Sequence, residues 1–286
     1  MTVTELKNKI LTELTPVVGA DEATAMMREV FWVLKRFKPV DIVLHGDQTV
    51  IPATVENAQR WVAQVKAGEP FQYAIGMANF MGMELKVTPA VLIPRPETAQ
   101  LVDIITDHAN SAPNLNVLDI GTGSGCIAIA LARALPYSTV TAVDNSKAAL
   151  SVAAQNVKSL RAGNVTLQYA DALNLAATVP ALPEPFDIIV SNPPYIAESE
   201  RPEIDPRVKN YEPASALFVP DSDPLRFYRA IGSYAHGALT RGGALFFEIN
   251  PLFAEQLRKM LTTQGWANVD IIRDYKGNLR FAVCTM

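Results

Sequence analysis

The 286-residue sequence has few cysteines and no long apolar run, and these absences exclude several classes of protein. Cys126 and Cys284 are its only cysteines, too few for a disulfide framework and too far apart in sequence for a zinc knuckle. No stretch approaches the roughly 18 uninterrupted apolar residues of a transmembrane helix, and the opening MTVTELKNKI lacks the apolar core of a signal peptide. We therefore expect a cytoplasmic protein in a reducing compartment, without a membrane partner.

The sequence also lacks runs of lysine or arginine and is poor in histidine. Its 25 basic and 29 acidic residues give a net charge of −4, which argues against direct nucleic-acid binding without excluding a polyanionic substrate. His45, His108 and His236 each stand alone in the sequence, so we assign them structural or surface roles, and we expect no metal site.

Residues 1–75 have the pattern of a small helical bundle. Apolar residues recur at helical spacing over 6–18 and 21–37. A third helix is predicted over 55–67, with Thr54 as its N-cap and Gly68 beyond its end. These apolar stripes most simply form the core of the bundle, which is also a candidate docking surface.

Residues 76–95 differ in character and predict a linker between two domains. Short β-favouring runs within 80–93, FMGMELKVTPAVLI, are separated by Gly82 and by Thr88-Pro89, which predicts a hairpin. Pro96 then stands near the start of a helix, the position that proline tolerates best.

Residues 96–286 predict an α/β domain. Buried strands alternate with helices early in this region, and two strands stand together at its end. The predicted strands span 116–120, 140–144, 165–169, 186–191, 244–249, 269–273 and 280–284. This order predicts a doubly wound, seven-stranded, mainly parallel sheet of the Rossmann-like type, whose last strands form an antiparallel pair.

A glycine loop between the first strand and its helix predicts a cofactor site. The loop reads Gly121-Thr122-Gly123-Ser124-Gly125 and lets a ligand approach the backbone at a helix N-terminus. Its spacing differs from the dinucleotide fingerprint, and Asp119 just before it suits a cation better than a diphosphate. S-adenosylmethionine, which carries a sulfonium and no phosphate, meets both conditions.

Acidic residues at the ends of the next two strands complete the predicted cofactor site. Asp144 is placed to bind both ribose hydroxyls, and Asp171 is placed to face the adenine edge. The predicted cofactor contacts also include Asn145 and Ala172, which follow these two residues, and Asn192.

The fourth strand ends at the turn Asn192-Pro193-Pro194-Tyr195. Two prolines cannot continue a central strand, because neither has an N–H for the ladder. The turn holds an amide side chain, two free carbonyls and an aromatic ring at the edge where open α/β sheets bind ligands. By itself it fits an ordinary strand-ending turn, but beside the glycine loop and the acidic strand ends it indicates the second half of one site.

Several motifs of the chain resemble those of a known family. VLDIGTGSGCIAIALA, AVD and SNPPYI resemble class I S-adenosylmethionine-dependent methyltransferases that modify a planar nitrogen. FQYAIG, LIPRPET, YEPASALF and RDYKGNLRFAV resemble, more narrowly, the protein-glutamine N5-methyltransferases of the PrmC/HemK family. This resemblance implies methylation of the glutamine in the Gly-Gly-Gln motif of peptide chain release factors, with the helical domain docking the protein substrate. Two positions depart from the family, which usually has Glu where this chain has Ala99 and Gly where it has Pro224.

The resemblance suggests a chemical role for the turn. A carboxamide nitrogen is a poor nucleophile, since its lone pair is delocalised into the carbonyl. The Asn192 side-chain oxygen and the backbone carbonyl of Pro193 or Pro194 can accept its two N–H bonds and bias charge onto nitrogen. Tyr195 can stack on the planar amide. We therefore predict these four residues as the catalytic set.

Three functional hypotheses remain open at this point. The leading one is glutamine methylation, and the alternatives are N-methylation of an exocyclic base amine in RNA or DNA and a non-catalytic assembly factor that binds S-adenosylmethionine. The acidic net charge argues against the second and the intact motifs against the third. For Arg95 and Glu97 an ion pair or a helix cap is the simpler role. For Glu248 two roles stay open, lining the cleft and packing within the fold.

Overall fold

The computed structural model describes residues 1–110, 112–178 and 185–286. They form two compact units. The first contains Met1–Met77 and Asp205–Tyr211, and the second contains Ala78–Ile204 and Glu212–Met286. The sequence prediction placed its domain boundaries at residues 75 and 95 and did not anticipate that a segment near residue 205 groups with the helices.

The first unit is built from helices around a core of its own. Its helices are α1 (Val3–Val18), α2 (Ala20–Lys35), α3 (Pro39–Leu44), α4 (Pro52–Lys66) and α5 (Phe71–Ile75). Leu6, Ile10, Leu14 and Phe31 are among the side chains buried between them. The prediction that Thr54 caps the third predicted helix is wrong, because α4 begins at Pro52, where proline is favoured at the first helical position.

A segment distant in sequence completes this unit. The short helix α10 (Pro206–Tyr211) carries Arg207, whose guanidinium pairs with Glu22 at 3.1 Å. The Tyr211 hydroxyl donates to the backbone carbonyl of Ala67 at 3.1 Å. These partners lie more than a hundred residues away in sequence, so no local pattern could predict them.

The predicted hairpin exists but is shorter and begins earlier than expected. Strands β1 (Met77–Phe80) and β2 (Met83–Lys86) pair around Met81 and Gly82, which both have positive φ, the backbone of a tight hairpin turn. The second half of the prediction is wrong, since residues 87–95 form turns and extended backbone. Thr88-Pro89 interrupts the β pattern there, because proline has no N–H for a ladder.

The second unit contains a seven-stranded sheet, counted over the described residues, in the order β10-β11-β9-β6-β3-β4-β5. The strands are β3 (Asn116–Ile120), β4 (Thr139–Asp144), β5 (Val165–Tyr169), β6 (Phe186–Ser191), β9 (Leu239–Glu248), β10 (Asn268–Arg273) and β11 (Leu279–Thr285). Neighbours from β9 to β5 are parallel, and β11 is antiparallel to both β9 and β10. The predicted doubly wound, mainly parallel sheet with an antiparallel end is therefore confirmed.

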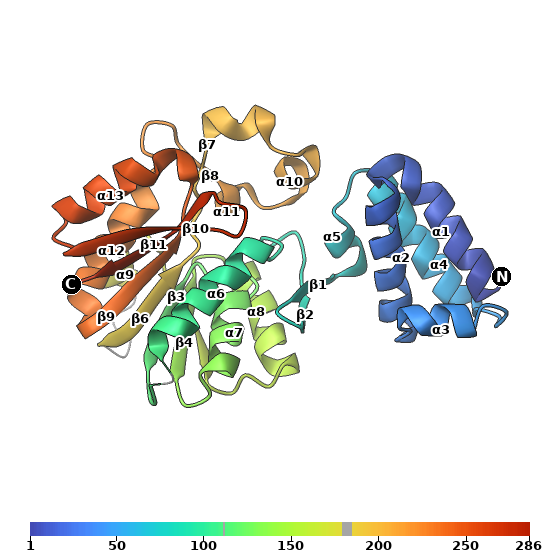
Figure 1. Cartoon of the computed structure of the whole chain (residues 1–286), viewed down its shortest axis with the longest axis horizontal. Coiled ribbons are helices and arrows are strands. Elements are labelled where there is room, and N and C mark those ends of the chain that lie inside the picture. The colour runs from blue at the N-terminus through green and yellow to red at the C-terminus, as the bar shows by residue number, and fades with distance from the viewer. Residues whose placement is uncertain (111, 179–184) are drawn as a thin grey trace. The chain divides into compact units, whose positions relative to one another are not determined.

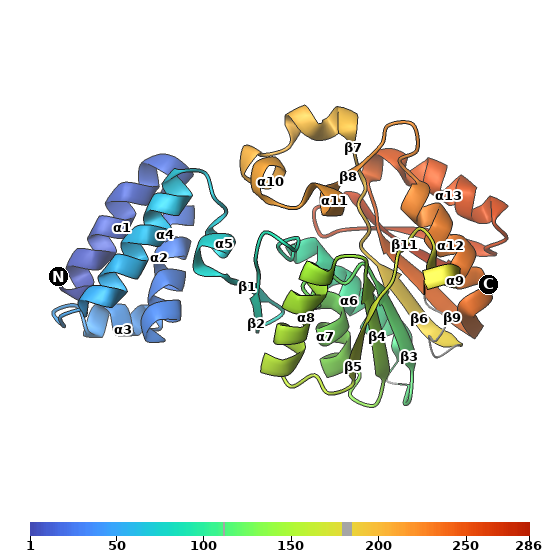
Figure 2. The same cartoon turned by 180° about the vertical axis from the view of Figure 1, so that it is seen from behind.

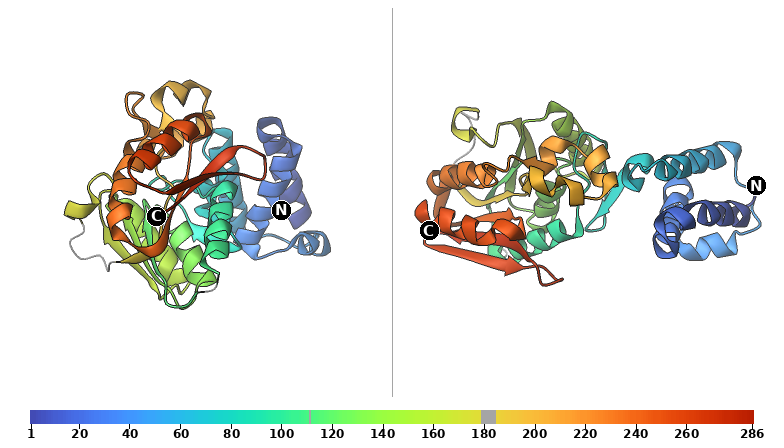
Figure 3. Two further views of the ribbon diagram at one scale, coloured as in Figure 1. Left: turned by 60° about the vertical axis from the view of Figure 1, so that its left-hand side comes forward. Right: turned by 90° about the horizontal axis from the view of Figure 1, so that it is seen from above.

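Helices cover both faces of this sheet. On one face lie α6 (Pro96–Ala109), α7 (Cys126–Ala134) and α8 (Lys147–Ser159), and on the other lie α12 (Arg226–Ala238) and α13 (Ala254–Thr263) (Figures 1 and 2). The left view of Figure 3 separates the green and orange helix layers. Neighbouring residues of a strand point to opposite faces of the sheet. Val117 packs in the core under α6 and α7, and Leu118 packs in the core under α12 and α13.

The sheet order brings three loops to one edge. Strand β3 lies between β4 and β6, and Ile120 at its end pairs with Val143 and Ser191. The carboxyl ends of these parallel strands therefore meet where successive crossovers leave the sheet in opposite directions, the usual ligand position in such folds.

Short elements fill the remaining connections. They are α9 (Leu175–Thr178), β7 (Ile196–Ala197), η1 (Glu198–Glu203), α11 (Ala214–Leu217), β8 (Phe218–Val219) and η2 (Pro251–Phe253). Strands β7 and β8 pair in parallel and form a separate two-stranded sheet. Across the described ranges, no helix is both long and apolar enough to cross a membrane.

Candidate active site

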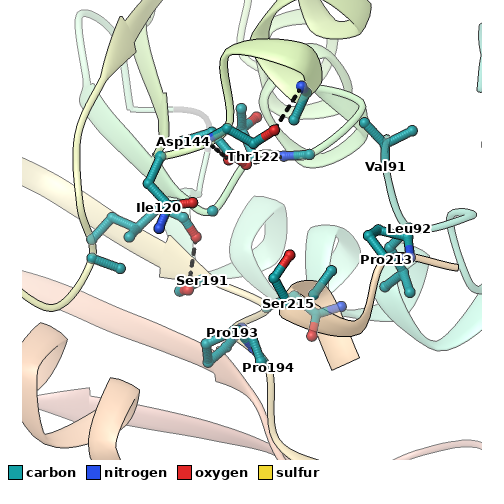
Figure 4. A pocket seen from close by; sticks show the side chains of 18 of the residues that line it. Val91, Leu92, Ile120, Thr122, Asp144, Ser191, Pro193, Pro194, Pro213 and Ser215 are labelled. Atoms are coloured by element: carbon teal, nitrogen blue, oxygen red, sulfur yellow. Dashed lines mark hydrogen bonds between the residues drawn. The ribbon is translucent and has the colours of Figure 1, made fainter. Parts of the chain in front are cut away.

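A cavity of about 440 Å³ opens at the carboxyl edge of β3, β4 and β6, within the second unit. It brings together most of the residues predicted from the sequence. Those that line it are Gly121, Thr122, Gly123, Ser124, Asp144, Asn145, Ala172, Asn192, Pro193 and Pro194. Figure 4 shows Pro193 and Pro194 on the opposite side of the cavity from Thr122 and Asp144. Four predicted residues, Asp119, Gly125, Asp171 and Tyr195, are outside this lining.

The glycine loop borders the cavity with bare backbone. Gly121 and Gly123 have φ values of 76° and 55°, which side-chain-bearing residues rarely adopt. A Cβ atom on either would meet no heavy atom within 4 Å, so the loop faces open space that a ligand can fill. At Gly125 a Cβ would lie 3.2 Å from Ile129 Cδ1, so this glycine serves the packing of α7.

Asp144 ends β4 with its carboxylate held by backbone amides. Its Oδ2 accepts from the Gly123 N–H at 2.9 Å, and its Oδ1 accepts from the Ser146 N–H at 2.8 Å. Burial raises the pKa of Asp144, and these hydrogen bonds oppose the shift. Each oxygen keeps a further lone pair, so the carboxylate can accept two hydroxyl donors of a ligand. These acceptor oxygens, together with the open glycine backbone, fit the ribose and amino-acid parts of S-adenosylmethionine.

Asp119 lies beneath the loop and is fully buried. The Thr122 hydroxyl donates to its Oδ2 at 2.7 Å, and its Oδ1 has no hydrogen-bond partner among the described residues. Burial raises the pKa of Asp119 to about 7, because the ionised form lacks sufficient donors. A cation bound above the loop would favour ionisation of this carboxyl.

Asp171 shapes the cavity wall from outside it. Its Oδ1 accepts from the Leu173 N–H at 3.0 Å and so holds the turn after β5. The residues that reach the cavity from this turn are Ala170, Ala172 and Leu173. The predicted contact of Asp171 with adenine stays a prediction.

Asn192 is tied to a buried carboxylate. Its Nδ2 donates to Glu248 Oε2 at 3.0 Å and to Thr98 Oγ1 at 3.3 Å. Thr98 Oγ1 in turn donates to Glu248 Oε2 at 2.7 Å, and Tyr195 donates from its hydroxyl to Glu248 Oε1 at 3.1 Å. Burial raises the pKa of Glu248, and the hydrogen bonds from Thr98 and Tyr195 oppose this. The Asn192 amide group therefore turns its nitrogen toward the carboxylate.

The structure gives Tyr195 a contact that was not predicted. Its hydroxyl binds Glu248, and its ring packs against the core formed by the β sheet and α12. Stacking on a substrate amide stays a prediction. Ser191 fixes the start of the turn, because its hydroxyl donates to the Ile120 carbonyl at 2.7 Å and ties β6 to β3 (Figure 4).

A further wall of the cavity contains Pro213 and is held by Glu212, both of which the sequence prediction missed, although it gave Arg95 an ion pair or cap as the simpler role. Glu212, whose side chain is fully buried, accepts from the Ile93 N–H at 3.1 Å and forms an ion pair with Arg95. The adjacent residues Leu92 and Pro213 line the cavity and lie together in Figure 4. The signal was present in the motifs LIPRPET and YEPASALF, each of which carries one charged partner of this pair.

Glu97 and the three histidines make contacts outside the cavity lining. Glu97 pairs with Lys276 at 2.7 Å. His45, His108 and His236 pack against the rings of Phe37, Phe246 and Trp266, respectively, and do not line the cavity. In the described part of the chain, no group of three or more His, Cys, Asp or Glu residues has the arrangement of a metal site.

Comparisons with known proteins agree with this geometry. A family model described as a methyltransferase domain matches residues 111–223. A curated protein of Bacteroides thetaiotaomicron, called release factor glutamine methyltransferase, is 41% identical over 84% of each chain. A Flavobacterium psychrophilum protein with the same name is 36% identical over 98% of each chain. The crystal structure of a methyltransferase from Pyrococcus furiosus shares the fold, with a TM-score of 0.51 and 19% identity over 80% of this chain and 97% of its own.

Proposed function

The chain belongs to the family of release factor glutamine methyltransferases, and we propose that it methylates the side-chain amide nitrogen of the glutamine in the Gly-Gly-Gln motif of peptide chain release factors. S-adenosylmethionine is the proposed methyl donor. One observation carries this proposal: a single cavity has the glycine loop and Asp144 on one side and the amide of Asn192 with two prolines on the other. A release factor acts in translation, so the proposed site of action is the cytoplasm.

The residues of the cavity divide into two groups by role. Gly121, Gly123 and Asp144 would hold S-adenosylmethionine, through open backbone and carboxylate lone pairs. When bound, this cofactor supplies an electrophilic methyl group on its sulfonium. The other side of the cavity has to hold a planar amide that is a weak nucleophile.

Asn192 and the two prolines are suited to that task. The Asn192 nitrogen is engaged by Glu248, which leaves Oδ1 as the acceptor for one N–H of the substrate amide. A proline carbonyl accepts the other, and its position is fixed because the ring locks φ. These acceptors raise electron density on the nitrogen and aim its lone pair. Correct placement of the two reactants contributes on the order of 7 to 11 kcal/mol to lowering the barrier.

No dedicated base is required by this scheme. The alkylated amide nitrogen is a strong acid and loses its proton readily once the N–C bond has formed. This agrees with the histidine positions, since none of the three lines the cavity. The helical unit, Met1–Met77 with Asp205–Tyr211, is the proposed docking domain for the protein substrate, as it has a core of its own and the cavity lies in the other unit.

The proposal is tested by locating the transferred label. We incubate the protein with S-adenosylmethionine carrying a tritiated methyl group and, in parallel, with purified release factor, ribosomal RNA and DNA. Label is expected in the release factor alone, within the proteolytic fragment that contains the Gly-Gly-Gln motif. A release factor with this glutamine replaced by alanine is the matched control and should stay unlabelled.

The other outcomes identify the alternatives. Label in nucleic acid alone would show a base methyltransferase. Cofactor binding in calorimetry without label in any of the three would indicate an assembly factor that binds the cofactor without turnover. Either result excludes glutamine methylation by this chain.

A further inference from the structure

The carboxylate of Glu248 accepts hydrogen bonds from three side chains in two segments beside the cavity. They are Thr98 near the start of α6, Asn192 after β6 and Tyr195 in the same turn. Glu248 itself ends β9 and is 1% exposed. A buried carboxylate is costly unless donors surround it, so this cluster needs an explanation other than packing.

We propose that Glu248 is a positioning residue, which fixes the Asn192 amide in the one orientation that turns Oδ1 toward the substrate. This inference rests on the proposed function, because the orientation matters only for an acceptor that presents N–H groups. Glu248 does not line the cavity and acts through Asn192.

The two ends of an asparagine side-chain amide differ in hydrogen bonding and hardly at all in shape. Its oxygen and its NH₂ group are nearly equal in shape, so packing alone does not distinguish the two orientations. An ionised carboxylate only accepts hydrogen bonds. With the amide reversed, Asn192 Oδ1 would face Glu248 Oε2, and the NH₂ group would face the N–H bonds of the substrate. Both contacts would be repulsive, so the carboxylate selects the productive orientation.

Thr98 reinforces the selection. Its hydroxyl donates to Glu248 Oε2 and so has lone pairs left, one of which accepts from Asn192 Nδ2 at 3.3 Å. Two acceptors therefore converge on the same NH₂ group. Tyr195 supplies a donor to the second carboxylate oxygen and holds the other end of the turn.

The main test is Glu248→Gln, which keeps the shape and replaces one acceptor oxygen by a donor. A glutamine can pair with Asn192 in either orientation, so the reversed amide becomes populated. We expect kcat with release factor to fall about 10- to 100-fold. The dissociation constant of S-adenosylmethionine should change by less than about twofold, because the glycine loop and Asp144 are unaffected.

Two further variants separate positioning from general damage. Glu97→Gln removes the same charge one residue from Thr98, in a surface ion pair with Lys276, and should retain the wild-type kcat. Thr98→Val keeps the side-chain volume and the Glu248 side chain but removes one acceptor for Asn192 and one donor to Glu248, and should lower kcat about three- to tenfold. It also tests the idea if Glu248→Gln does not fold.

The second readout does not depend on methyl transfer. In protein labelled with nitrogen-15 asparagine, the side-chain amide of Asn192 is identified by its loss in Asn192→Ala. Its protons should exchange slowly with solvent in the wild type and in Glu97→Gln, and at least about tenfold faster in Glu248→Gln.

The outcomes are distinguishable. Wild-type kcat in Glu248→Gln, or equal exchange of the Asn192 amide in that variant and the wild type, would overturn the positioning role. A fall in kcat accompanied by lost cofactor binding would also overturn it, since the carboxylate would then support the whole site. If the wild type labels no release factor, the proposed function fails, and the exchange rates alone decide whether Glu248 orients the amide.

Discussion

Glu212 and Arg95 form an ion pair that joins two segments of the second unit 117 residues apart in sequence. The Glu212 side chain is fully buried, while that of Arg95 is 32% exposed. Glu212 also accepts the Ile93 N–H at 3.1 Å, so one carboxylate anchors the chain before α6 to the chain before α11. Leu92 and Pro213, which line the cavity, are neighbours of the residues that make this contact, so the contact holds that part of the cavity wall in place.

Replacement of Glu212 by glutamine should loosen this wall. The variant loses the charge partner of Arg95, and since Arg95 is partly solvated, the free energy of unfolding should fall by about 1 to 3 kcal/mol. The KM for release factor should rise while the dissociation constant of S-adenosylmethionine changes little. Urea denaturation and steady-state kinetics measure the two effects. Glu198→Gln, which removes a solvent-exposed pair with Arg201, should change neither quantity.

The bare backbone at Gly121 should be needed for cofactor binding. Gly121→Ala forces a residue with a Cβ into φ 76° and extends that Cβ into the cavity. Gly277→Ala is the matched control, because Gly277 has φ 87°, open surroundings and a place in the turn between β10 and β11. Both variants should lose about 1 to 2 kcal/mol of stability. Only Gly121→Ala should weaken S-adenosylmethionine binding, by at least about tenfold in calorimetry, and equal affinities would contradict the role of the loop.

Asn192→Ala should separate cofactor binding from turnover. The variant removes the proposed acceptor for the substrate amide and leaves Gly121, Gly123 and Asp144 in place. We expect kcat to fall about 100- to 1,000-fold, the usual cost of losing one group that stabilises the transition state. Calorimetry should show unchanged binding of S-adenosylmethionine. Abolished cofactor binding in a folded variant would show that Asn192 serves the donor side instead.

The sheet was predictable because its signals are local. Strands such as Asn116–Ile120 and Phe186–Ser191 are short apolar runs bounded by glycine or proline, and the structure reproduces both ranges. The ends of these strands carry the site, so the glycine loop and Asn192 could be placed at one edge from their order along the chain.

The buried carboxylates could not be placed in this way. Glu248 and its donor Thr98 are 150 residues apart, and their contact depends on how β9 and α6 pack in three dimensions. The segment 205–211 likewise groups with distant helices. Periodicity reports which face of an element is buried, and it does not report which polar side chains meet there. Most of the residues that the sequence patterns predicted therefore line the cavity, and the patterns identified Arg95 and Glu248 without the side chains that pair with them.

Asp119 should make the stability of the ligand-free protein depend on pH. Burial raises the pKa of Asp119 from its ordinary 3.8 to about 7. Between these values the carboxyl is protonated in the folded protein and ionised in the unfolded chain, so unfolding releases a proton. The contribution of Asp119 to the free energy of unfolding therefore decreases as pH rises from about 4 to about 7, and is constant above that.

The variant Asp119→Asn removes this titration and measures it by difference. Relative to the wild type, the variant should gain up to about 4 kcal/mol of unfolding free energy between pH 4 and pH 7, at 1.36 kcal/mol per pH unit. Urea denaturation at several pH values, without ligand, gives the difference curve. Asp205→Asn is a control whose difference curve should slope the other way. The hydrogen bond from Arg207 lowers the pKa of Asp205, so the wild type gains stability as pH rises and that carboxyl ionises. A flat difference curve for Asp119→Asn would mean that this carboxyl is already ionised in the folded protein near pH 4, so that the Thr122 hydroxyl suffices to stabilise the charge.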